Sequence, residues 1–322
     1  MDHGGNMKKP RKTHKHKCKL PEFKIKNILS LQDAKQKSGW GITAFNLPEA
    51  WVKLGMGEGV TVAVIDTGCD LNHPDLKDNL LPGFNFVKPG SLPEDGNCHG
   101  THCAGIISGI NNEIGMVGVA PKCKIIPIKA LDDEGNGNME DVAKAVRWAA
   151  NNGADIISMS LGSPMPVQQV RKAIQYAEKK KIVTFVAAGN AGNTKDVFFP
   201  AAYPETIAIG SIDKDFDRST FSNTGRNLDF MAPGSDIFST VPDDWYAILS
   251  GTSMACPFAV GVAALVLSYK RKNKVNFSLE TAEDYRAIFK KYCTGVPDKL
   301  NDKFYQGFGI IDPRKFIKEY KG

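Results

Sequence analysis

Three side chains, in the chain order Asp66, His99 and Ser253, are of the types needed for nucleophilic catalysis. A serine hydroxyl is a weak nucleophile until a base takes its proton, and the base needs a third group to orient it. Ser253 comes directly before a long apolar run at 259–269, which predicts a buried helix with Ser253 in its first turn. The unpaired N–H groups at such a helix start can stabilise an oxyanion. These residues therefore predict acyl transfer at a serine.

The elements that would position the other two side chains are also visible in the sequence. Asp66 ends the apolar stretch that begins at Thr61, and a glycine turn follows, as expected for a strand with a carboxylate at its end. His99 opens a second helical stretch. The chain has six histidines, of which three lie in the first 16 residues, so His73, His99 and His102 are the remaining candidates for the base.

Three short blocks carry a resemblance to a known family. The blocks are Asp-Thr-Gly at 66–68, His-Gly-Thr-His at 99–102 and Gly-Thr-Ser-Met-Ala at 251–255. They resemble the signature blocks of the subtilisin-like serine proteases (subtilases) in the same order, over roughly residues 40–312. Three blocks in order are far more specific than any one of them. In character the chain is closest to the intracellular subtilisins.

The resemblance implies a serine endopeptidase that forms an acyl-enzyme on Ser253, with His99 as the general base and Asp66 as the group that orients it. It also implies that Asn190, at the end of an apolar strand, supplies an oxyanion-hole N–H. The alternative is a catalytically idle protein of the same fold that serves as a binding or regulatory module. An intact set of all four residues favours the enzyme.

Substrate would bind through its backbone as an added strand, according to the resemblance. The edge segments that pair with it match 135–137 and 160–162, so the expected substrate-binding residues are Gly135, Ser160, Leu161 and Gly162. Phe198 falls near the floor of the first specificity pocket, where relatives often carry a small residue. We therefore expect a narrowed pocket that favours small or medium apolar side chains before the scissile bond.

The segment 110–116 resembles the family's structural calcium loop. The implied Ca²⁺ ligands are carbonyl, amide and carboxylate oxygens, which suit a hard cation. They come from Gln36, Asp75, Ile110, Asn112, Ile114 and Met116. An unmetallated surface loop is the alternative.

Three cysteines, Cys69, Cys98 and Cys103, flank the predicted triad, and we expect them to be small buried hydrophobic side chains rather than nucleophiles.

The fold class follows from the alternation of apolar strands and amphipathic helices in a chain of 322 residues, 42% of them hydrophobic. We expect a doubly wound, mostly parallel sheet with helices on both faces, in one subtilisin-like peptidase domain at 36–322. Asp66, Ser160 and Asn190 would share a cleft at the carboxyl ends of the strands. The expected strands are 61–66, 124–131, 154–160, 182–188, 206–212 and 236–241, and the expected helices are 47–51, 139–151, 167–180, 280–292 and 313–320.

Residues 1–35 read as a basic N-terminal extension. Its first 26 residues hold nine Lys and Arg against two carboxylates, a net charge of +7, which leaves −1 for the rest of a chain whose total is +6. The net charge of the body is therefore close to zero, and with Phe23 as the one aromatic residue among the tail's basic ones we do not expect nucleic acid as a partner. The block Leu20-Pro21-Glu22-Phe23 resembles a proline-containing block in the extensions of intracellular subtilisins, which occupy the active-site cleft. The extension is therefore a candidate inhibitor that is removed on activation, and a solvated tail without contact to the cleft is the alternative.

The compartment is expected to be the cytoplasm. The charged N-terminus has no apolar segment typical of a secretory signal, and seven cysteines without a disulfide spacing favour a reducing environment. We expect no membrane segment, because the apolar run behind Ser253 is short and rich in Gly and Ala. The oligomeric state and the physiological substrate do not follow from the sequence.

Overall fold

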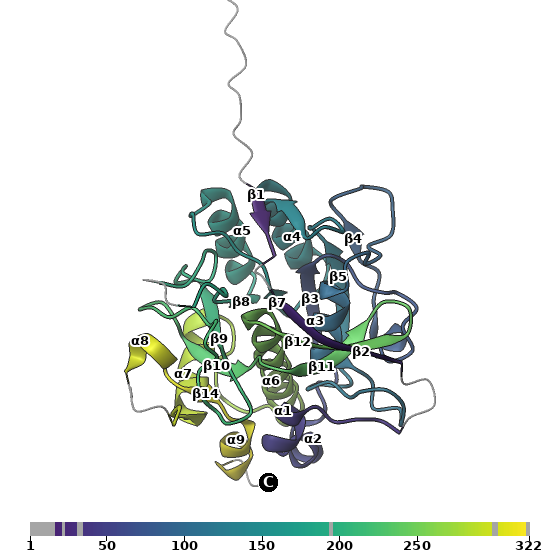
Figure 1. Cartoon of the computed structure of the whole chain (residues 1–322). Helices are drawn as coiled ribbons and strands as arrows, with labels where there is room; N and C mark the ends of the chain where they lie inside the picture. The colour runs from purple at the N-terminus through teal and green to yellow at the C-terminus, as the bar shows by residue number, and fades with distance from the viewer. Residues whose placement is uncertain (1–16, 21–22, 31–34, 193–195, 298–301, 320–322) are drawn as a thin grey trace, which may run out of the picture.

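The computed structural model describes residues 17–20, 23–30, 35–192, 196–297 and 302–319. Its centre is a nine-stranded sheet, which confirms the predicted fold class (Figure 1). Within the described residues, seven of the eight strand pairings in this sheet are parallel and one, at the β13 edge, is antiparallel. The strands, in spatial order, are β13 (Cys293–Thr294), β14 (Ile310–Ile311), β10 (Phe230–Pro233), β9 (Thr206–Ile212), β8 (Val183–Ala187), β7 (Ile156–Met159), β3 (Thr61–Asp66), β5 (Lys124–Lys129) and β4 (Phe84–Asn85).

Helices cover both faces of this sheet, as Figure 1 shows. Two of them, α3 (His99–Ser108) and α6 (Thr252–Asn273), pack on each other and on the central strands. On the other face, α4 (Met139–Asn151) and α5 (Gln168–Lys179) pack side by side over β3, β5 and β8. Because both faces are covered, the central strands are mostly apolar, and every residue of β8 and β9 is buried, including Thr184, Thr206 and Ser211.

Six further helical elements lie in the described residues. They are α1 (Trp40–Ala44), α2 (Leu47–Leu54), a 3₁₀ turn η1 (Lys77–Asn79), α7 (Ala282–Tyr292), α8 (Lys303–Gln306) and α9 (Pro313–Glu319). By length and composition α6 passes as a membrane-spanning candidate, but 94% of its most apolar window is buried inside the protein. It is therefore a core helix that packs on the central sheet.

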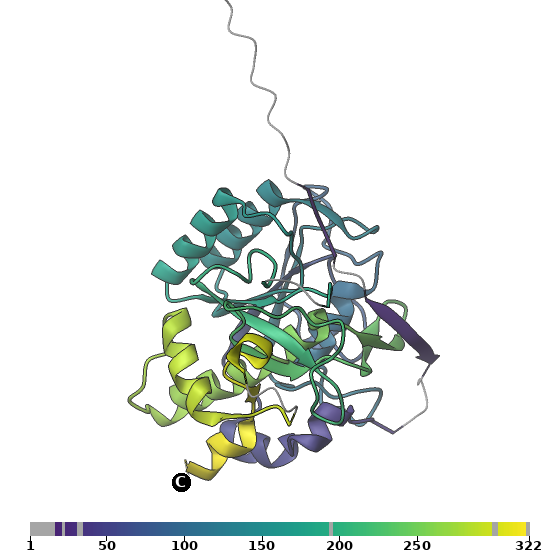
Figure 2. The same cartoon turned by 60° about the vertical axis from the view of Figure 1, so that its left-hand side comes forward.

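Two smaller sheets involve the N-terminal segment. One joins β1 (Lys17–Lys19) to β6 (Asn136–Asn138) in antiparallel fashion. The other has the order β11 (Ile237–Val241), β12 (Trp245–Ser250), β2 (Lys24–Ser30), with both pairings antiparallel. In Figure 2, β2 lies on the outside of the molecule, at the right-hand edge. The predicted strand 236–241 thus exists as β11, but it belongs to this second sheet and not to the parallel one.

Most predicted elements agree with the structure to within one or two residues at each end. The predicted helix 139–151 and strand 206–212 match α4 and β9 at both ends. No structure was expected for residues 1–19, yet 17–19 form β1. Residues 1–16 lie outside the described part of the chain.

Candidate active site

The carboxyl end of β3 and the start of α3 bring Asp66 and His99 together. Asp66 is the last residue of β3 and His99 is the first residue of α3. The Nδ1 atom of His99 lies 2.8 Å from Oδ1 of Asp66, and the backbone N–H of Thr67 donates to the same oxygen at 2.8 Å. Both side chains are fully buried. Because a carboxylate only accepts, His99 carries its proton on Nδ1 and presents Nε2 as a base.

Ser253 is the second residue of α6, behind the N-cap Gly251, as the sequence predicts. Its hydroxyl donates to the Ser160 carbonyl at 3.3 Å rather than to His99. Among the described residues, His99 Nε2 and Asp66 Oδ2 are buried without a hydrogen-bond partner. The base and the hydroxyl are therefore both present in one buried site, with the hydrogen bond between them not formed.

Asn190 lies just past the end of β8 and contacts the start of α6. Its Oδ1 accepts from the backbone N–H of Thr252 at 2.9 Å and from the Thr252 hydroxyl at 2.7 Å. These two bonds set the orientation of the amide group. The Nδ2 atom lies 3.0 Å from the point that a Cβ on Gly251 would occupy, a tight contact that a side chain at position 251 would have to relieve.

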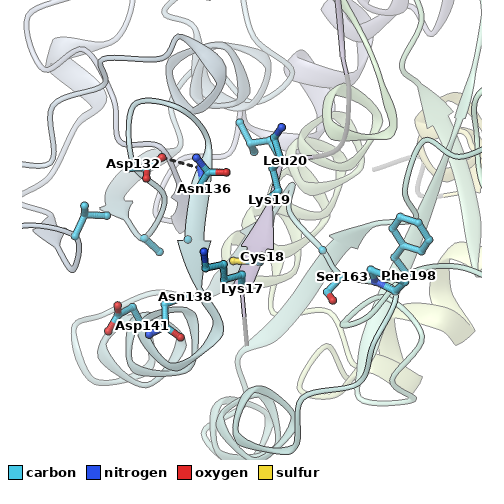
Figure 3. Close-up of a pocket in the computed structure, with 15 residues that line it drawn as sticks. Lys17, Cys18, Lys19, Leu20, Asp132, Asn136, Asn138, Asp141, Ser163 and Phe198 are labelled. Carbon is cyan, nitrogen blue, oxygen red and sulfur yellow. Dashed lines mark hydrogen bonds between the residues drawn. The ribbon is translucent and has the colours of Figure 1, made fainter. Parts of the chain in front are cut away.

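The N-terminal segment runs through the cleft as an extra strand. Cys18 pairs with Gly137 in β6, and Lys19 forms an antiparallel bridge with Gly162 on the opposite side. The backbone N–H of Leu20 donates to the Gly135 carbonyl at 2.9 Å. Figure 3 shows β1 between β6 and the segment that carries Ser163, and these three segments line a pocket of about 910 Å³. The predicted edge residues Gly135 and Gly162 therefore pair with this segment.

Three side chains of the segment point into the protein. Cys18 is 4% exposed between two exposed lysines, and Leu20 is 7% exposed with its side chain against Gly135. Phe23 is half-buried and its ring lies against that of His99. Pro21 and Glu22 lie outside the described residues. The burial of Cys18 was missed because one apolar residue between lysines carries no strand signal.

Phe198 lies beside the end of β8. Its backbone N–H donates to the Ala188 carbonyl at 2.9 Å, which fixes it beside the strand end that carries Asn190. A Cβ built on Gly189 would meet the Phe198 ring at 2.8 Å, and one built on Gly162 would lie 3.5 Å from the Phe198 Cβ. The ring thus fills space beside two segments that flank the cleft, and Leu161 between them is fully buried.

The predicted calcium ligands converge on one point. The Nε2 atom of Gln36 lies 2.7 Å from the Ile110 carbonyl, 3.0 Å from that of Ile114, 3.1 Å from that of Met116 and 3.2 Å from Asn112 Oδ1. An amide nitrogen has two hydrogens and cannot serve four acceptors. A cage of oxygens around one position suits a hard cation such as Ca²⁺, which takes about six to eight oxygen ligands. The residues therefore fit an ion of this class.

Asp75 borders the same group. Its Oδ1 accepts from Asn112 Nδ2 at 2.9 Å, and its Oδ2 accepts from the Met116 N–H and from the Tyr246 hydroxyl, each at 2.8 Å. The side chain is fully buried, so these hydrogen bonds, and a cation in the neighbouring oxygen cage, would offset the cost of removing its carboxylate from water.

The cysteines around the site are neutral thiols. Cys103 Sγ lies 3.9 Å from His99 Nδ1 and 3.4 Å from the Ser253 carbonyl. Burial raises the pKa of Cys103 well above its usual value, and burial together with the nearby Asp95 and Asp66 raises that of Cys98 to about 12. A thiol becomes a nucleophile only as the thiolate. Cys69 and Cys103 are buried beside the site, as the sequence predicts, whereas Cys98 is only half-buried, and the raised pKa values of all three thiols argue against competition with Ser253.

Known proteins are similar to this chain over most of its length. Residues 57–309 match the model of the subtilase family, Peptidase_S8. Thermitase of Thermoactinomyces vulgaris is 42% identical over 247 residues, which is 76% of this chain and 88% of thermitase. The major intracellular serine protease of Bacillus subtilis (strain 168) is 40% identical over 72% of this chain and 76% of its own length. Subtilisin E of the same organism is 38% identical over 86% of this chain and 70% of its own length.

Proposed function

The chain belongs to the subtilase family and is a serine endopeptidase, and from this premise we propose that Ser253 is its nucleophile, His99 its general base and Asp66 the group that orients His99. The observation that carries the assignment is the 2.8 Å contact between His99 Nδ1 and Asp66, beside a serine at the start of a buried helix. Labelling of the protein by a serine-directed covalent probe tests it.

The proposed reaction begins when the Ser253 hydroxyl turns from the Ser160 carbonyl to His99 Nε2. His99 takes the proton as Oγ attacks the peptide carbonyl, and Asp66 stabilises the imidazolium that forms. The oxyanion accepts N–H bonds from the Ser253 backbone and from Asn190 Nδ2, a donor whose loss costs about 10²–10³ in kcat. His99 then protonates the leaving amine, and water hydrolyses the acyl-enzyme by the same route in reverse.

Peptide substrates are proposed to bind as an added strand between β6 and the segment 160–162. The pairing of the chain's own residues with Gly135, Gly137 and Gly162 supports this, because those backbone groups can serve any extended peptide. Phe198 is proposed to narrow the first pocket, and Leu161 and Ser160 to form its wall beside the scissile bond. Main-chain bonds supply affinity and the pockets supply preference.

The extension is proposed to hold the enzyme as a zymogen. Residues 17–20 use the same backbone groups that a substrate would need, and Phe23 packs on the proposed base. A tethered segment has a high effective concentration, so modest affinity is sufficient for inhibition. On this proposal residues 1–35 are an inhibitory extension and 36–322 the peptidase domain, and removal of the extension frees the cleft.

Calcium is the proposed resident ion of the oxygen cage formed with Gln36. The ligands would be the carbonyls of Ile110, Ile114 and Met116 and the side chains of Gln36, Asn112 and Asp75, with the Gln36 amide turned so that Oε1 faces the ion. When bound, the ion supplies structural stability and no chemistry in the reaction. Gln36 follows the proposed inhibitory extension directly, so a bound ion would hold the residue at which the extension joins the peptidase domain.

The cytoplasm is the proposed compartment. All seven cysteines are free thiols in the structure, as expected in a reducing environment. One relative from Bacillus subtilis is named an intracellular serine protease, whereas the names thermitase and subtilisin E state no compartment. Disulfide mapping after oxidative refolding tests the need for reduced thiols.

A further inference from the structure

A buried carboxylate that is not one of the proposed catalytic residues joins the two elements that carry them. Asp95 accepts five hydrogen bonds. Its Oδ1 accepts from the Thr67 hydroxyl at 2.8 Å, the Asn97 N–H at 2.9 Å and the Cys98 N–H at 3.1 Å. Its Oδ2 accepts from the N–H and the hydroxyl of Thr101 at 2.9 and 2.6 Å. We propose that Asp95 is a positioning residue that sets His99 against Asp66, an inference that rests on the proposed function.

The donors lie on both sides of the Asp66–His99 pair. Thr67 follows Asp66 at the end of β3, whereas Asn97, Cys98 and Thr101 bracket His99 at the start of α3. The Thr67 hydroxyl also accepts from the Gly100 N–H at 2.9 Å. Asp95 and Thr67 therefore form a two-step bridge from the strand end to the first turn of the helix. Any change in that bridge alters the distance between the carboxylate and the imidazole.

The N–H groups in the first turn of α3 bond to side chains that precede the helix, among them Asn97 Oδ1, which accepts from His99 at 3.3 Å. Cys98 at the N-cap has φ +110°, in the left-handed region, and makes no side-chain capping bond. The N–H groups at a helix start need outside acceptors, and a negative charge there is favoured by the helix dipole. Asp95 accepts a hydrogen bond from the Thr101 N–H, and the Thr67 hydroxyl accepts one from the Gly100 N–H. His99, the first residue of the helix, is held by these acceptors.

Both oxygens of Asp95 face donors, and this makes the site specific for a carboxylate. The side chain is 7% exposed, and among the described residues no Lys, Arg or His forms an ion pair with it. An asparagine in its place would turn an NH₂ group toward two or three N–H or O–H groups whichever way the amide is placed. The substitution Asp95→Asn therefore keeps the size of the side chain and breaks one half of the bridge.

A second buried carboxylate provides a matched control. Asp229 is also 7% exposed, and it accepts from the Ala208 N–H at 2.9 Å and from Arg286 at 2.7 and 3.2 Å. It lies beside β9 and β10, away from the β3 and α3 ends that carry Asp66 and His99. Asp229→Asn thus breaks a buried polar network of similar size without touching the bridge, so a general loss of stability is separated from a loss of positioning.

The test uses the full chain, incubated with calcium until its mass is constant. Steady-state kinetics on a peptide substrate and the NMR resonance of the His99 Nδ1 proton are measured for the wild type and for both variants. Asp95→Asn is expected to lower kcat by about 10²-fold, the cost of a misplaced catalytic group, with KM unchanged and the proton resonance shifted. Asp229→Asn is expected to lower the melting temperature and leave kcat and the resonance as in the wild type.

The inference is overturned if folded Asp95→Asn keeps the kcat and the resonance of the wild type, or if Asp229→Asn loses as much kcat. Should Asp95→Asn not fold, Thr67→Val decides, because it removes the bridging hydroxyl and keeps the carboxylate. A shifted resonance and a lowered kcat in Thr67→Val support the bridge, and wild-type values reject it. An inactive wild type would reject the proposed function instead, so the two failures are distinguishable.

Discussion

The ring of Phe23 lies with its centroid 5.1 Å from that of the His99 imidazole, at an interplanar angle of 48°. Phe23 belongs to the N-terminal segment and His99 to the centre of the site, so this contact joins the extension to the proposed base. Leu20, three residues earlier, is buried in the cleft. Both residues of the extension therefore lie at the site, where His99 and Ser253 are fully buried.

Deleting residues 1–30, which removes Phe23 and keeps Gln36, is expected to raise the initial rate on a peptide substrate and to abolish any lag. The physical reason is that Gly135 and Gly162 then lose their internal partner. The matched control deletes residues 1–16 only, which leaves β1 and β2 in place and should leave the protein inhibited. Equal initial rates for all three proteins, with no self-trimming by mass spectrometry, would rule out inhibition by the extension.

A serine-directed fluorophosphonate is expected to add one label per molecule to the protein without residues 1–30, and none to the same protein with Ser253→Ala. Intact mass spectrometry measures the label, and a peptide map places it. Hydrolysis of substrate by Ser253→Ala above a mock purification would contradict the assignment of the nucleophile.

Phe198→Gly is expected to change the preference for the residue before the scissile bond from small or medium apolar side chains toward Phe and Tyr. The Phe198 ring occupies space beside Gly189 and Gly162 that a larger substrate side chain would need. Each methylene in such a pocket is worth roughly 1–3 kcal/mol of discrimination. A peptide library profiled with both proteins measures the change, and a wild-type profile already led by Phe or Tyr would show that Phe198 lies outside the pocket.

Calcium is expected to raise the unfolding temperature, because an ion that binds only the native state stabilises it. The free energy of unfolding rises by about 2.7 kcal/mol when the free ion is at one hundred times its Kd. Differential scanning calorimetry with calcium and with a chelator measures the shift. Gln36→Ala, which removes one side chain from the oxygen cage, should respond less to calcium. An unfolding temperature that chelation leaves unchanged would mean that the loop binds no ion.

Acid is expected to destabilise the fold through His102. Burial lowers the pKa of His102 from 6.5 to about 3, and its Nε2 donates to the Ala247 carbonyl at 3.1 Å. Between those two pH values the unfolded chain binds a proton that the folded chain does not, so stability falls as pH falls from 6.5 toward 3. At pH 4 the loss is roughly 3 kcal/mol, from 1.36 kcal/mol per pKa unit.

His102→Gln keeps an N–H donor without a titrating group and is the control for that prediction. Urea unfolding at pH 7 and pH 4 measures the difference in unfolding free energy for each protein. The difference should be smaller in His102→Gln than in the wild type. The same difference in both proteins would assign the acid sensitivity to other groups.

The parts of the fold that the sequence predicted are those with a local signal. β8 and β9 are continuous apolar runs because both of their faces are covered, and α4 shows helical spacing because one of its faces is buried. Asp66 and Ser253 were found because each lies where an apolar element begins or ends. In these cases the neighbours along the chain determine the burial of the residue.

The parts that were not predicted depend on residues distant in sequence. β2 pairs with β12, more than 200 residues away, and Cys18 is buried only because β6 and Gly162 lie on either side of it. Asp95 follows Pro93 and Glu94 and precedes a glycine, a pattern typical of a solvated turn. Its burial follows from Thr67, which only the folded strand brings to it.

The position of Ser253 on α6 has a consequence for how activity is lost. Seventeen consecutive residues of that helix, from Thr252 to Ser268, are buried between the central sheet and its neighbours. Amide protons in such a helix exchange with deuterium only when the whole domain opens, whereas those of β1 exchange when a three-residue strand detaches. Heat inactivation should therefore coincide with global unfolding and not with a local opening. The temperature at which activity at Ser253 is lost would then equal the temperature at which the whole domain unfolds.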